Sequence, residues 1–397
     1  MVYNIILYTY ILYPASESGG DALKNNLHIG LCGFGFMGKT HLFAVRNLPF
    51  FCTLPFSADV TGLCTSHPDA CAAAAAEWDI PKAFASEADM IADPDIDVID
   101  ICTPNPCHFE TARAALAAGK HVLCEKPLTV TAAEADELVR LADASGLVCG
   151  TVYNNRFLPP VIRARQLIGE GRLGRVLSFD FAYRHNSDID PDRRVGWKQT
   201  AAGGGGTLYD LGPHALDLCR LLCGDICAVT GKSQIAFPTH LTPDGGLWQT
   251  DADEAFYLIA RTTGGAVGTV TLSKLTQGEN DGLTFSIYGT DGALRFDLMD
   301  PDYLYFYDAH APGTPVGGLR GYTRIECVGR FPAPASGFPS AKAPIGWLRG
   351  HVGALADFLS AVYDGRQPSA AFSDGAAVMH VMEAAGLSDR EGREVLI

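Results

Sequence analysis

The feature that most constrains the fold is a glycine-rich turn between a short apolar run and a helix. The apolar run covers residues 27–32, and the chain continues as Gly33-Phe34-Gly35-Phe36-Met37-Gly38, with helical signals to about residue 48. In this G-x-G-x-x-G pattern the first glycine permits a tight turn, the second lets a pyrophosphate approach the backbone, and the third lets the helix pack on the strand. The N–H groups at the helix start favour phosphate binding. The pattern predicts a dinucleotide site, and a plain strand-to-helix turn is the alternative.

Apolar runs alternate with helix signals from residue 27 to residue 152. We expect further strands at residues 59–64, 97–102, 121–124 and 147–152. Among the helix signals, Asn105 is expected to cap a helix that has Pro106 at its first position, and Thr131 with Glu134 indicates a capping box. Alternation of this kind predicts one doubly wound α/β domain, a Rossmann-type dinucleotide-binding domain with a parallel sheet.

The end of the second expected strand bears on the choice of dinucleotide. It reads Thr65-Ser66-His67-Pro68. An acidic side chain here would hold the ribose 2′-OH of NAD, and an arginine would accommodate the 2′-phosphate of NADP. Neither residue is present. Thr65, Ser66 and His67 can donate hydrogen bonds to a 2′-phosphate, which favours NADP. The alternative is that Ser66 or His67 caps the helix that begins at Pro68.

Two loops follow neighbouring strands of the predicted sheet. Thr103-Pro104-Asn105-Pro106 comes after the strand at 97–102, and Glu125-Lys126-Pro127 comes after the strand at 121–124. Because ligands bind at the carboxyl ends of the strands in an open α/β sheet, Lys126 lies where chemistry would occur. The alternative is a surface lysine paired with Glu125. Besides the glycine-rich turn, the residues expected to contact the dinucleotide are Thr65, Ser66, Thr103, Pro104, Asn105, His108, Glu125 and Lys126.

The sequence pattern changes after Asn154-Asn155-Arg156-Phe157. A helix is expected at residues 161–169, and strands that alternate apolar and polar residues are expected at 175–185, 254–262, 266–275 and 283–288. Gly264-Gly265 is typical of a two-residue hairpin turn. Helices are expected at 347–363 and 374–387. Residues 153–397 are therefore predicted to form an α+β domain built on a large, mostly antiparallel open sheet.

A second group of reactive residues lies in the glycine-rich run at residues 203–217. Pro213 suits the first turn of a helix, so His214 falls in that turn and Asp210 just before it. A spacing of four residues lets the carboxylate and the imidazole lie close together. A carboxylate fixes the tautomer of an imidazole and raises its basicity, as a general base near neutral pH requires. The alternative for His214 is a histidine bonded to the local backbone.

Length and composition narrow the class of protein. The 397 residues favour two domains, and the net charge of −15 argues against nucleic acids and anionic membrane surfaces as partners. The twelve cysteines contain no Cys-x-x-Cys pair and complete no set of metal ligands. We therefore expect reduced thiols, a cytoplasmic location and no metal. Residues 1–26 are expected to be an extension, because their apolar part is too short to span a bilayer and lacks signal-peptide features.

Three motifs in this order resemble the Gfo/Idh/MocA family of oxidoreductases: residues 33–38, Glu125-Lys126-Pro127 and residues 204–217. The resemblance covers about residues 27–397. It implies a Rossmann domain followed by a domain whose open sheet forms the interface of a homodimer or homotetramer. It also implies hydride transfer between a nicotinamide and a secondary alcohol carbon of a sugar, cyclitol or glycoside. By the same resemblance Lys126 hydrogen-bonds the reacting oxygen, His214 takes its proton, and Asp210 orients His214.

The chain departs from the family at the end of the second strand, which lacks an acid, and at Asn154-Asn155, where relatives often carry an arginine. The residues expected to contact the polyol or sugar substrate are Lys126, Asn154, Asn155, Arg156, Trp197, Lys198, Asp210 and His214. A packed loop residue is the alternative for Trp197. Two other functions stay open: a glycosidase that uses tightly held NAD as a transient oxidant, and a non-catalytic sensor that binds a dinucleotide and a protein partner. The retained catalytic residues argue against the sensor.

Overall fold

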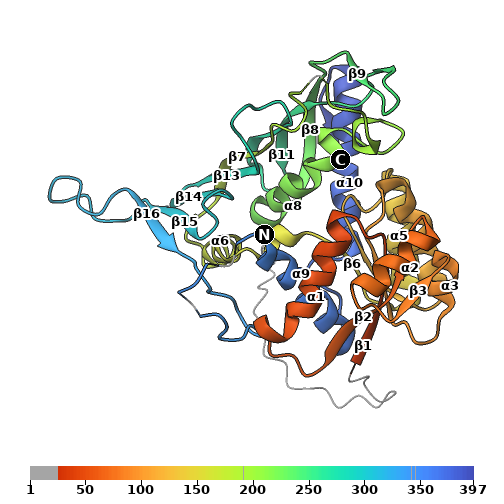
Figure 1. Ribbon diagram of the computed structural model, residues 1–397. Coiled ribbons are helices and arrows are strands. Elements are labelled where there is room, and N and C mark those ends of the chain that lie inside the picture. Colours follow the sequence, from red (N-terminus) through yellow and green to blue (C-terminus); the bar gives the residue numbers. More distant parts are fainter. Residues whose placement is uncertain (1–25, 191, 341, 345) are drawn as a thin grey trace.

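The computed structural model describes residues 26–190, 192–340, 342–344 and 346–397, and two β-sheets organise them (Figure 1). The extension expected over residues 1–26 lies outside the described residues, except for Asn26, which begins the first strand. One sheet is parallel and the other is mostly antiparallel, so the predicted fold class is confirmed. In the part of the chain that the structure describes, no helix is sufficiently long and apolar to cross a membrane.

The parallel sheet has its six strands in the order β3-β2-β1-β4-β5-β6. Its strands are β1 (Asn26–Cys32), β2 (Ser57–Cys64), β3 (Lys82–Phe84), β4 (Val98–Ile101), β5 (His121–Cys124) and β6 (Cys149–Thr151). The central strands are short apolar runs buried on both faces, as is typical of a parallel sheet covered by helices. The chain changes direction across the sheet between β1 and β4, which is where ligands bind in doubly wound folds.

Helices from both ends of the chain cover the parallel sheet. They are α1 (Phe36–Phe51), α2 (Pro68–Glu77), α3 (Glu87–Ala92), α4 (His108–Ala117), α5 (Ala132–Ser145) and α9 (Leu348–Asp364). Side chains of α1, α2 and α9 pack in one apolar cluster, and those of α3, α4 and α5 pack in another. The predicted capping box of Thr131 and Glu134 is present at the start of α5, and Gly146 ends that helix in the left-handed region.

The second sheet runs β16-β15-β14-β13-β7-β12-β11-β8-β17 and is antiparallel except between β7 and β12. Its strands are β7 (Val176–Arg184), β8 (Ile226–Gln234), β11 (Ala255–Thr262), β12 (Val267–Ser273), β13 (Gly282–Gly289), β14 (Gly292–Asp297), β15 (Tyr303–Asp308), β16 (Tyr322–Glu326) and β17 (Val395–Leu396). A separate pair is formed by β9 (Thr239–Leu241) and β10 (Leu247–Gln249).

Helices pack on one face of the second sheet (Figure 1). They are α6 (Pro159–Gly169), α8 (Gly212–Cys223) and α10 (Phe372–Glu391), and the short helix α7 (Thr207–Asp210) precedes α8. The opposite face carries exposed side chains such as Tyr257 and Ile259. Since α10 also contacts α5 and β6, this helix joins the two sheets.

Two local expectations are corrected by the structure. Asn105 does not cap a helix: it begins a 3₁₀ turn, η1 (Asn105–Cys107), and its amide donates to the carbonyl oxygen of Gly204 at 2.9 Å. The hairpin between β11 and β12 has a longer loop than two residues. The Thr262 N–H donates to the Ala266 oxygen at 2.9 Å, so residues 263–265 form the loop, and Gly265 takes the positive φ of 85° that closes it.

Arg156, which was expected to contact substrate, is instead buried in an ion network. It lies in the 3₁₀ turn η2 (Asn154–Phe157), and its Nε donates to an Asp217 oxygen at 2.8 Å. A second guanidinium nitrogen lies 3.0 Å from an Asp374 oxygen, and a third donates to the carbonyl oxygen of Ser369. These acceptors occupy the guanidinium, so the expectation of a substrate contact is corrected. Arg156 connects η2 to α8 and α10.

We predict that Arg156→Ala lowers the free energy of unfolding by about 3–5 kcal/mol, because it leaves the buried Asp217 carboxylate without its cation. Urea unfolding of the full chain measures the change. Arg163→Ala is the matched control: Arg163 pairs with Glu170 at the surface, at 3.0 Å, and such pairs contribute roughly 0–1 kcal/mol. Equal losses in the two variants would contradict a stabilising role for the Arg156 network.

Candidate active site

The glycine-rich turn has the geometry that a dinucleotide phosphate requires. Gly33 has a φ of +87°, and a Cβ there would lie 2.6 Å from the carbonyl oxygen of Cys102. A Cβ at Gly38 would lie 2.2 Å from the oxygen of Gly33. At Gly35 no described atom lies within 4 Å of the Cβ position, so the backbone there is open to a ligand. No described side chain caps α1, which leaves its first N–H groups for phosphate oxygens. The turn fits a dinucleotide.

Three loops leave the sheet side by side because β1, β4 and β5 are neighbours. The Cys102 N–H donates to the Cys32 oxygen at 2.8 Å, and the Glu125 N–H donates to the Ile101 oxygen at 2.9 Å. The glycine-rich turn, the loop at 102–107 and the loop at 125–127 therefore begin at the same carboxyl edge. Parallel pairing thus brings Lys126 to the edge where the dinucleotide turn lies.

His108 and Asn105 join these loops to their surroundings. His108 is fully buried, with its ring nitrogens 2.8 Å from the Pro127 oxygen and 2.9 Å from the Thr103 oxygen. Asn105 is buried as well and binds Gly204, so we correct the expectation of a cofactor contact for both side chains. Pro104 is exposed, and the hydroxyl of Thr103 is buried with no partner among the described residues. Cofactor contacts from these last two residues stay a prediction.

Thr65 and Ser66 stand at the end of β2, beside the glycine-rich turn, since the Gly33 N–H donates to the Cys64 oxygen at 2.8 Å. The Thr65 hydroxyl donates to the His67 oxygen at 3.2 Å, and Ser66 is exposed. His67 precedes α2, but no side chain in the described ranges makes a cap hydrogen bond there. His67 thus occupies the N-cap position of α2, as the alternative has it, but its side chain makes no cap hydrogen bond.

One carboxylate, that of Asp210, gathers three lysine side chains. Lys126 Nζ donates to the backbone oxygen of Asp210 at 2.7 Å and to its Oδ1 at 3.2 Å. Lys198 Nζ lies 3.1 Å from Oδ1, and Lys274 Nζ lies 3.1 Å from Oδ2. Lys126 follows β5 of the parallel sheet, whereas Lys274 follows β12 of the second sheet. We call these four residues the lysine cluster, and it connects the two sheets.

The lysine cluster carries a net positive charge, because three ammonium groups face one carboxylate. Although burial opposes ionisation, the lysines hold the pKa of the Asp210 carboxyl well below its usual range. Burial lowers the pKa of Lys126, and the Lys198 cation adds to this effect, while Asp210 opposes it. Two of the three Lys126 N–H groups point at Asp210, which leaves the third for a ligand oxygen. A fixed positive field of this kind stabilises an oxygen that becomes negative.

His214 lies in the first turn of α8, as predicted, but Asp210 does not pair with it. The Asp210 oxygens bind the lysines, and within the described residues no hydrogen bond joins Asp210 to His214. The buried Nδ1 of His214 also has no partner there. We therefore correct the expectation that Asp210 orients His214. Burial, followed by the Lys126 cation, lowers the pKa of His214 to about 3. The imidazole is neutral at pH 7 and can accept a proton.

The other expected substrate residues divide into open and enclosed positions. Trp197 begins the 3₁₀ turn η3 (Trp197–Gln199) and is 40% exposed, with the Lys198 ammonium 5.5 Å from its ring centroid. Asn154 and Asn155 are buried, and the Asn154 amide donates to the Asn155 side-chain oxygen at 3.2 Å. Exposed side chains can meet a substrate without rearrangement, which favours Trp197 and Lys198 over the two asparagines.

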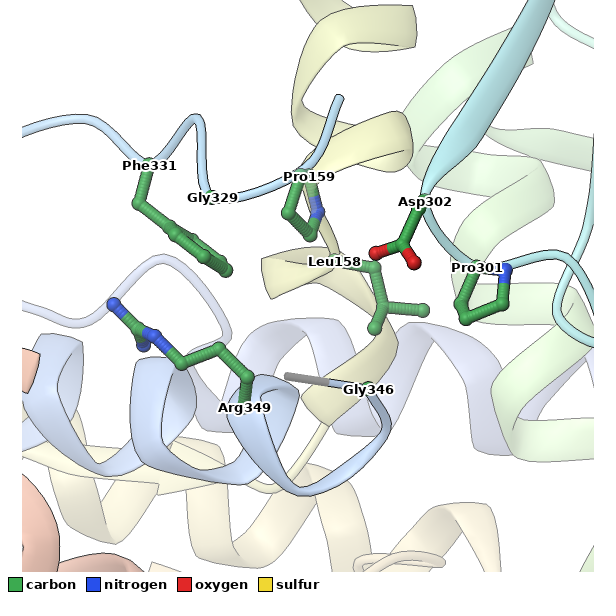
Figure 2. A pocket seen from close by; sticks show the side chains of 8 residues that line it. All are labelled: Leu158, Pro159, Pro301, Asp302, Gly329, Phe331, Gly346 and Arg349. Carbon is green, nitrogen blue, oxygen red and sulfur yellow. The ribbon is translucent and has the colours of Figure 1, made fainter. Parts of the chain in front are cut away.

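A separate small pocket lies where the starts of α6 and α9 meet the loops near residues 301 and 330. Figure 2 shows Leu158, Asp302, Phe331 and Arg349 around it. The Arg349 guanidinium lies 3.9 Å from the centroid of the Phe331 ring. None of the residues that line this pocket belongs to the glycine-rich turn or to the lysine cluster. The candidate site is therefore not this pocket. It lies at the carboxyl edge of the parallel sheet, where the reactive groups are.

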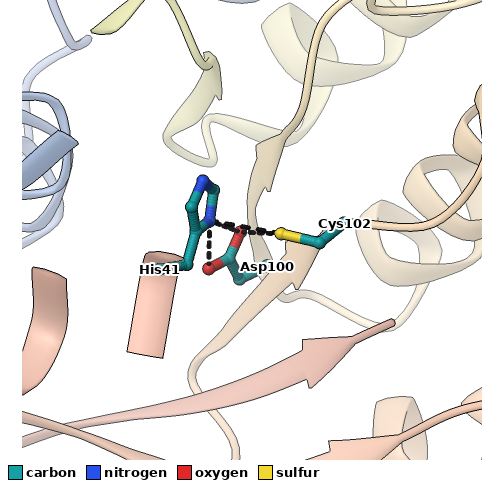
Figure 3. A group of neighbouring side chains, drawn as sticks. All are labelled: His41, Asp100 and Cys102. Carbon is teal, nitrogen blue, oxygen red and sulfur yellow. Dashed lines mark hydrogen bonds and ion pairs between the residues drawn. The ribbon is translucent and has the colours of Figure 1, made fainter. Parts of the chain in front are cut away.

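A buried group of polar residues surrounds His41 (Figure 3). Nδ1 of His41 lies 2.9 and 3.0 Å from the two Asp100 oxygens and 3.3 Å from the Cys102 sulfur. Nε2 lies 3.1 Å from Oε1 of Glu125, whose Oε2 accepts the Lys126 N–H at 3.0 Å. Both Glu125 oxygens thus face protein donors, which corrects the expected cofactor contact. In the described ranges, His41, Asp100 and Cys102 form the one group that could hold a metal ion. We assign none, because both ring nitrogens already bind carboxylates.

Lys274 and His41 belong to no motif, yet each has a sequence signal. Lys274 continues the inward side of β12 after Val270 and Leu272, so a lysine falls where alternation calls for an apolar residue. His41 lies on the buried stripe of α1 with Val45. A polar residue at such a position indicates a buried interaction. Its partner is far along the chain, however, and cannot be named from the pattern.

The fold and the site define an NAD(P)-binding oxidoreductase. Residues 27–153 match the oxidoreductase family with an NAD-binding Rossmann fold, and residues 161–295 match the GFO/IDH/MocA C-terminal domain. The chain belongs to the GFO/IDH/MocA family, as the three sequence motifs indicate.

Similar proteins include dehydrogenases named for sugars and cyclitols. Levoglucosan dehydrogenase of Pseudarthrobacter phenanthrenivorans is 32% identical over 377 residues, which cover 90% of this chain and 95% of that protein. A structure of levoglucosan dehydrogenase with NADH and levoglucosan matches with a TM-score of 0.89 at 31% identity, over 94% of this chain and 99% of that one. The scyllo-inositol 2-dehydrogenase (NADP(+)) of Bacillus subtilis is 34% identical over 164 residues, 40% of this chain and 45% of that protein.

We predict that the His214 imidazole stays neutral from pH 8 down to pH 5, so that kcat/KM shows no loss near the ordinary histidine pKa of about 6.5. Removal of the Lys126 cation in Lys126→Met should raise the pKa of His214, because a nearby positive charge disfavours the imidazolium. Nitrogen chemical shifts of the ring, followed by NMR as a function of pH, measure both effects. Lys232→Met, at an exposed lysine, is the matched control. An unchanged His214 titration in Lys126→Met would contradict the predicted coupling.

Proposed function

We propose that this protein is an NAD(P)-dependent dehydrogenase that transfers a hydride between the nicotinamide and a secondary alcohol carbon of a sugar or cyclitol. The observation that carries the proposal is that Lys126, at the carboxyl edge of the parallel sheet, binds Asp210 directly before α8, the helix whose first turn holds His214. Relatives named for levoglucosan, D-xylose and scyllo-inositol support a polyhydroxylated substrate.

In the oxidising direction His214 accepts the proton of the substrate hydroxyl, since its imidazole is neutral. Lys126 donates its remaining N–H to the same oxygen, and the lysine cluster stabilises the negative charge that develops there. Asp210 keeps the three ammonium groups in place. The bound nicotinamide supplies the hydride acceptor. In the reducing direction the proton reaches the oxygen through His214, whose imidazole carries it only during the transfer.

We infer that the site accepts both dinucleotides and prefers NADP. Positions 65–67 at the end of β2 carry no carboxylate that would repel a 2′-phosphate, and the Ser66 hydroxyl is exposed there. Ser66 can donate to a phosphate oxygen, and Thr65 can do so once its hydroxyl turns away from the His67 oxygen. One relative is named for NADP(+) and another was solved with NADH, so both dinucleotides occur among the similar proteins.

We also propose that the exposed face of the second sheet joins copies of this chain into a homodimer or homotetramer. Tyr257 and Ile259 on β11 and Val267 on β12 are all exposed on neighbouring strands. Adjacent apolar side chains on an open sheet face are typical of a protein interface.

The twelve cysteines, all free, suit a reducing compartment, for which we propose the cytoplasm.

Lys126→Ala and His214→Ala should each lower kcat by about two orders of magnitude or more, because each removes a group that acts on the reacting oxygen. Dinucleotide binding should persist, since neither change alters the glycine-rich turn. Formation of reduced cofactor with a panel of sugars, cyclitols and glycosides measures turnover. Fluorescence titration of each variant with NAD and NADP measures binding, and we expect NADP to bind at least as tightly as NAD.

Lys232→Ala is the matched control for these variants, because Lys232 is exposed on β8 and pairs with Asp389 away from the site. It should keep the wild-type turnover. Near-normal turnover in both site variants would overturn the assignment. Cleavage of a glycoside without net formation of reduced cofactor would indicate the glycosidase instead, and much weaker binding of NADP than of NAD would contradict the cofactor preference.

Ile259→Arg should convert the oligomer to a monomer of 42.3 kDa, because a charge at the centre of the proposed interface would lose its water on assembly. Size-exclusion chromatography with light scattering measures the mass. Leu247→Arg, at an exposed apolar residue on β10, is the control and should leave the mass of the assembly unchanged. A monomeric wild-type protein would contradict the proposed interface.

A further inference from the structure

His41 is a fully buried histidine with a carboxylate at each ring nitrogen. Nδ1 faces both oxygens of Asp100, and Nε2 faces Oε1 of Glu125 at 3.1 Å. The exposed fractions of the side chains of His41, Asp100 and Glu125 are 0%, 2% and 8%. Charges so far from water persist only where they compensate one another. The three residues therefore form one buried ionic unit, which we call the His41 triad.

The charge state of the triad follows from its hydrogen bonds. An ionised carboxylate is only an acceptor, so a ring nitrogen that binds one must carry a proton. Burial disfavours the charged ring, but Asp100 outweighs it and raises the pKa of His41 well above the usual value. Burial opposes ionisation of Glu125 too, but the His41 hydrogen bond brings the pKa of Glu125 down to about 2. His41 is therefore an imidazolium between two carboxylates.

The triad connects three elements that each lead into the candidate site. His41 lies on α1, three residues after the last glycine of the dinucleotide turn. Asp100 lies on β4, which leads to Thr103-Pro104, and Glu125 directly precedes Lys126. A single side chain thus holds the phosphate-binding helix against the two loops at the carboxyl edge.

Glu125 connects the His41 triad to Lys126. Its Oε2 accepts the backbone N–H of Lys126 at 3.0 Å, so the side chain folds back on the next peptide group and fixes the direction in which Lys126 leaves β5. Lys126 Nζ then reaches the Asp210 backbone oxygen at 2.7 Å. Without His41, the Glu125 carboxylate would lose its donor at Oε1 and be free to turn away from the Lys126 N–H.

We propose that His41 is a positioning residue, which holds Glu125 so that the Lys126 ammonium stays aligned with the reacting oxygen. The proposal rests on the proposed function, in which Lys126 acts on that oxygen. In the described ranges no hydrogen bond or ion pair joins His41 to the lysine ammonium or to His214, so its connection to the lysine runs through Glu125. A displacement of about 1 Å at a catalytic group lowers the rate on the order of a hundredfold. Loss of the positioning contact should therefore be measurable as a lower kcat.

His41→Gln and Glu125→Gln test the proposal in a double-mutant cycle. Each single variant should lower kcat by about 10- to 100-fold, while KM and the dinucleotide dissociation constant change less than about threefold. The double variant should be no slower than the slower single variant, because the two residues act as one unit. Additive losses in kcat, or a wild-type kcat in folded His41→Gln, would overturn the proposal.

His351→Gln is the matched control, because His351 is also a buried histidine and its ring centroid lies 6.2 Å from that of His41. It does not contact Glu125 through any hydrogen bond in the described ranges. This variant should keep kcat within about threefold of wild type, well short of the loss expected from displacing a catalytic group. A loss as large as that of His41→Gln would show that any change in this core slows the enzyme, and would overturn the specific role of His41.

Ring-nitrogen NMR of wild-type His41 gives a test that requires no variant to fold. Both nitrogens should carry protons at pH 8, since each faces a carboxylate. An Nε2 of His41 that carries no proton in the wild-type protein would overturn the proposal, because it could not donate to Glu125. Failure of the proposed function is distinguishable, because it appears as normal turnover in Lys126→Ala and His214→Ala, whereas failure of this inference leaves those variants inactive and His41→Gln active.

Discussion

Parallel pairing of β1, β4 and β5 is the constraint on which the candidate site depends. Parallel strands all end at one edge, so the loops that follow them must emerge together. In this chain those loops carry the glycine-rich turn, Thr103-Pro104 and Lys126. Most side chains inside the sheet are apolar, although Asp100 on β4 is buried there and pairs with His41. The pairing of the strands therefore decides where the site lies, because the candidate reactive residues are in the loops that emerge at this edge.

Compensation of buried charge is the second constraint, and it operates at three places. Arg156 is paired with Asp217 and Asp374, and the His41 imidazolium is paired with two carboxylates, so one cation faces two carboxylates at each place. At the lysine cluster the excess charge is positive, because three ammonium groups share the carboxylate of Asp210. Pairing of buried charges holds the fold together, whereas an excess of cations leaves a positive field that acts on a ligand.

The sequence predicts those features that depend only on residues close together in the chain. The glycine-rich turn, the capping box at Thr131 and the strand that ends just before Glu125-Lys126 each depend on residues within a few positions of one another. The assignment of Asp210 to His214 fails for the opposite reason. Their spacing permits contact, but lysines from remote segments compete for the same oxygens. His108, Asn105 and Glu125 were likewise expected at the cofactor and are instead bound inside the protein.

The sequence by itself indicated the alternation of strands and helices over residues 27–152 and the glycine-rich turn, and it marked Lys126 and His214 as candidate reactive groups. These follow from the period of apolar residues and from short motifs, which depend on local backbone geometry. Only the tertiary structure decided that Lys274 joins Lys126 at Asp210, and that His41 meets Asp100 and Glu125. Such pairs form between residues far apart in the chain, and a buried charge selects its partner by distance in space rather than by spacing in sequence.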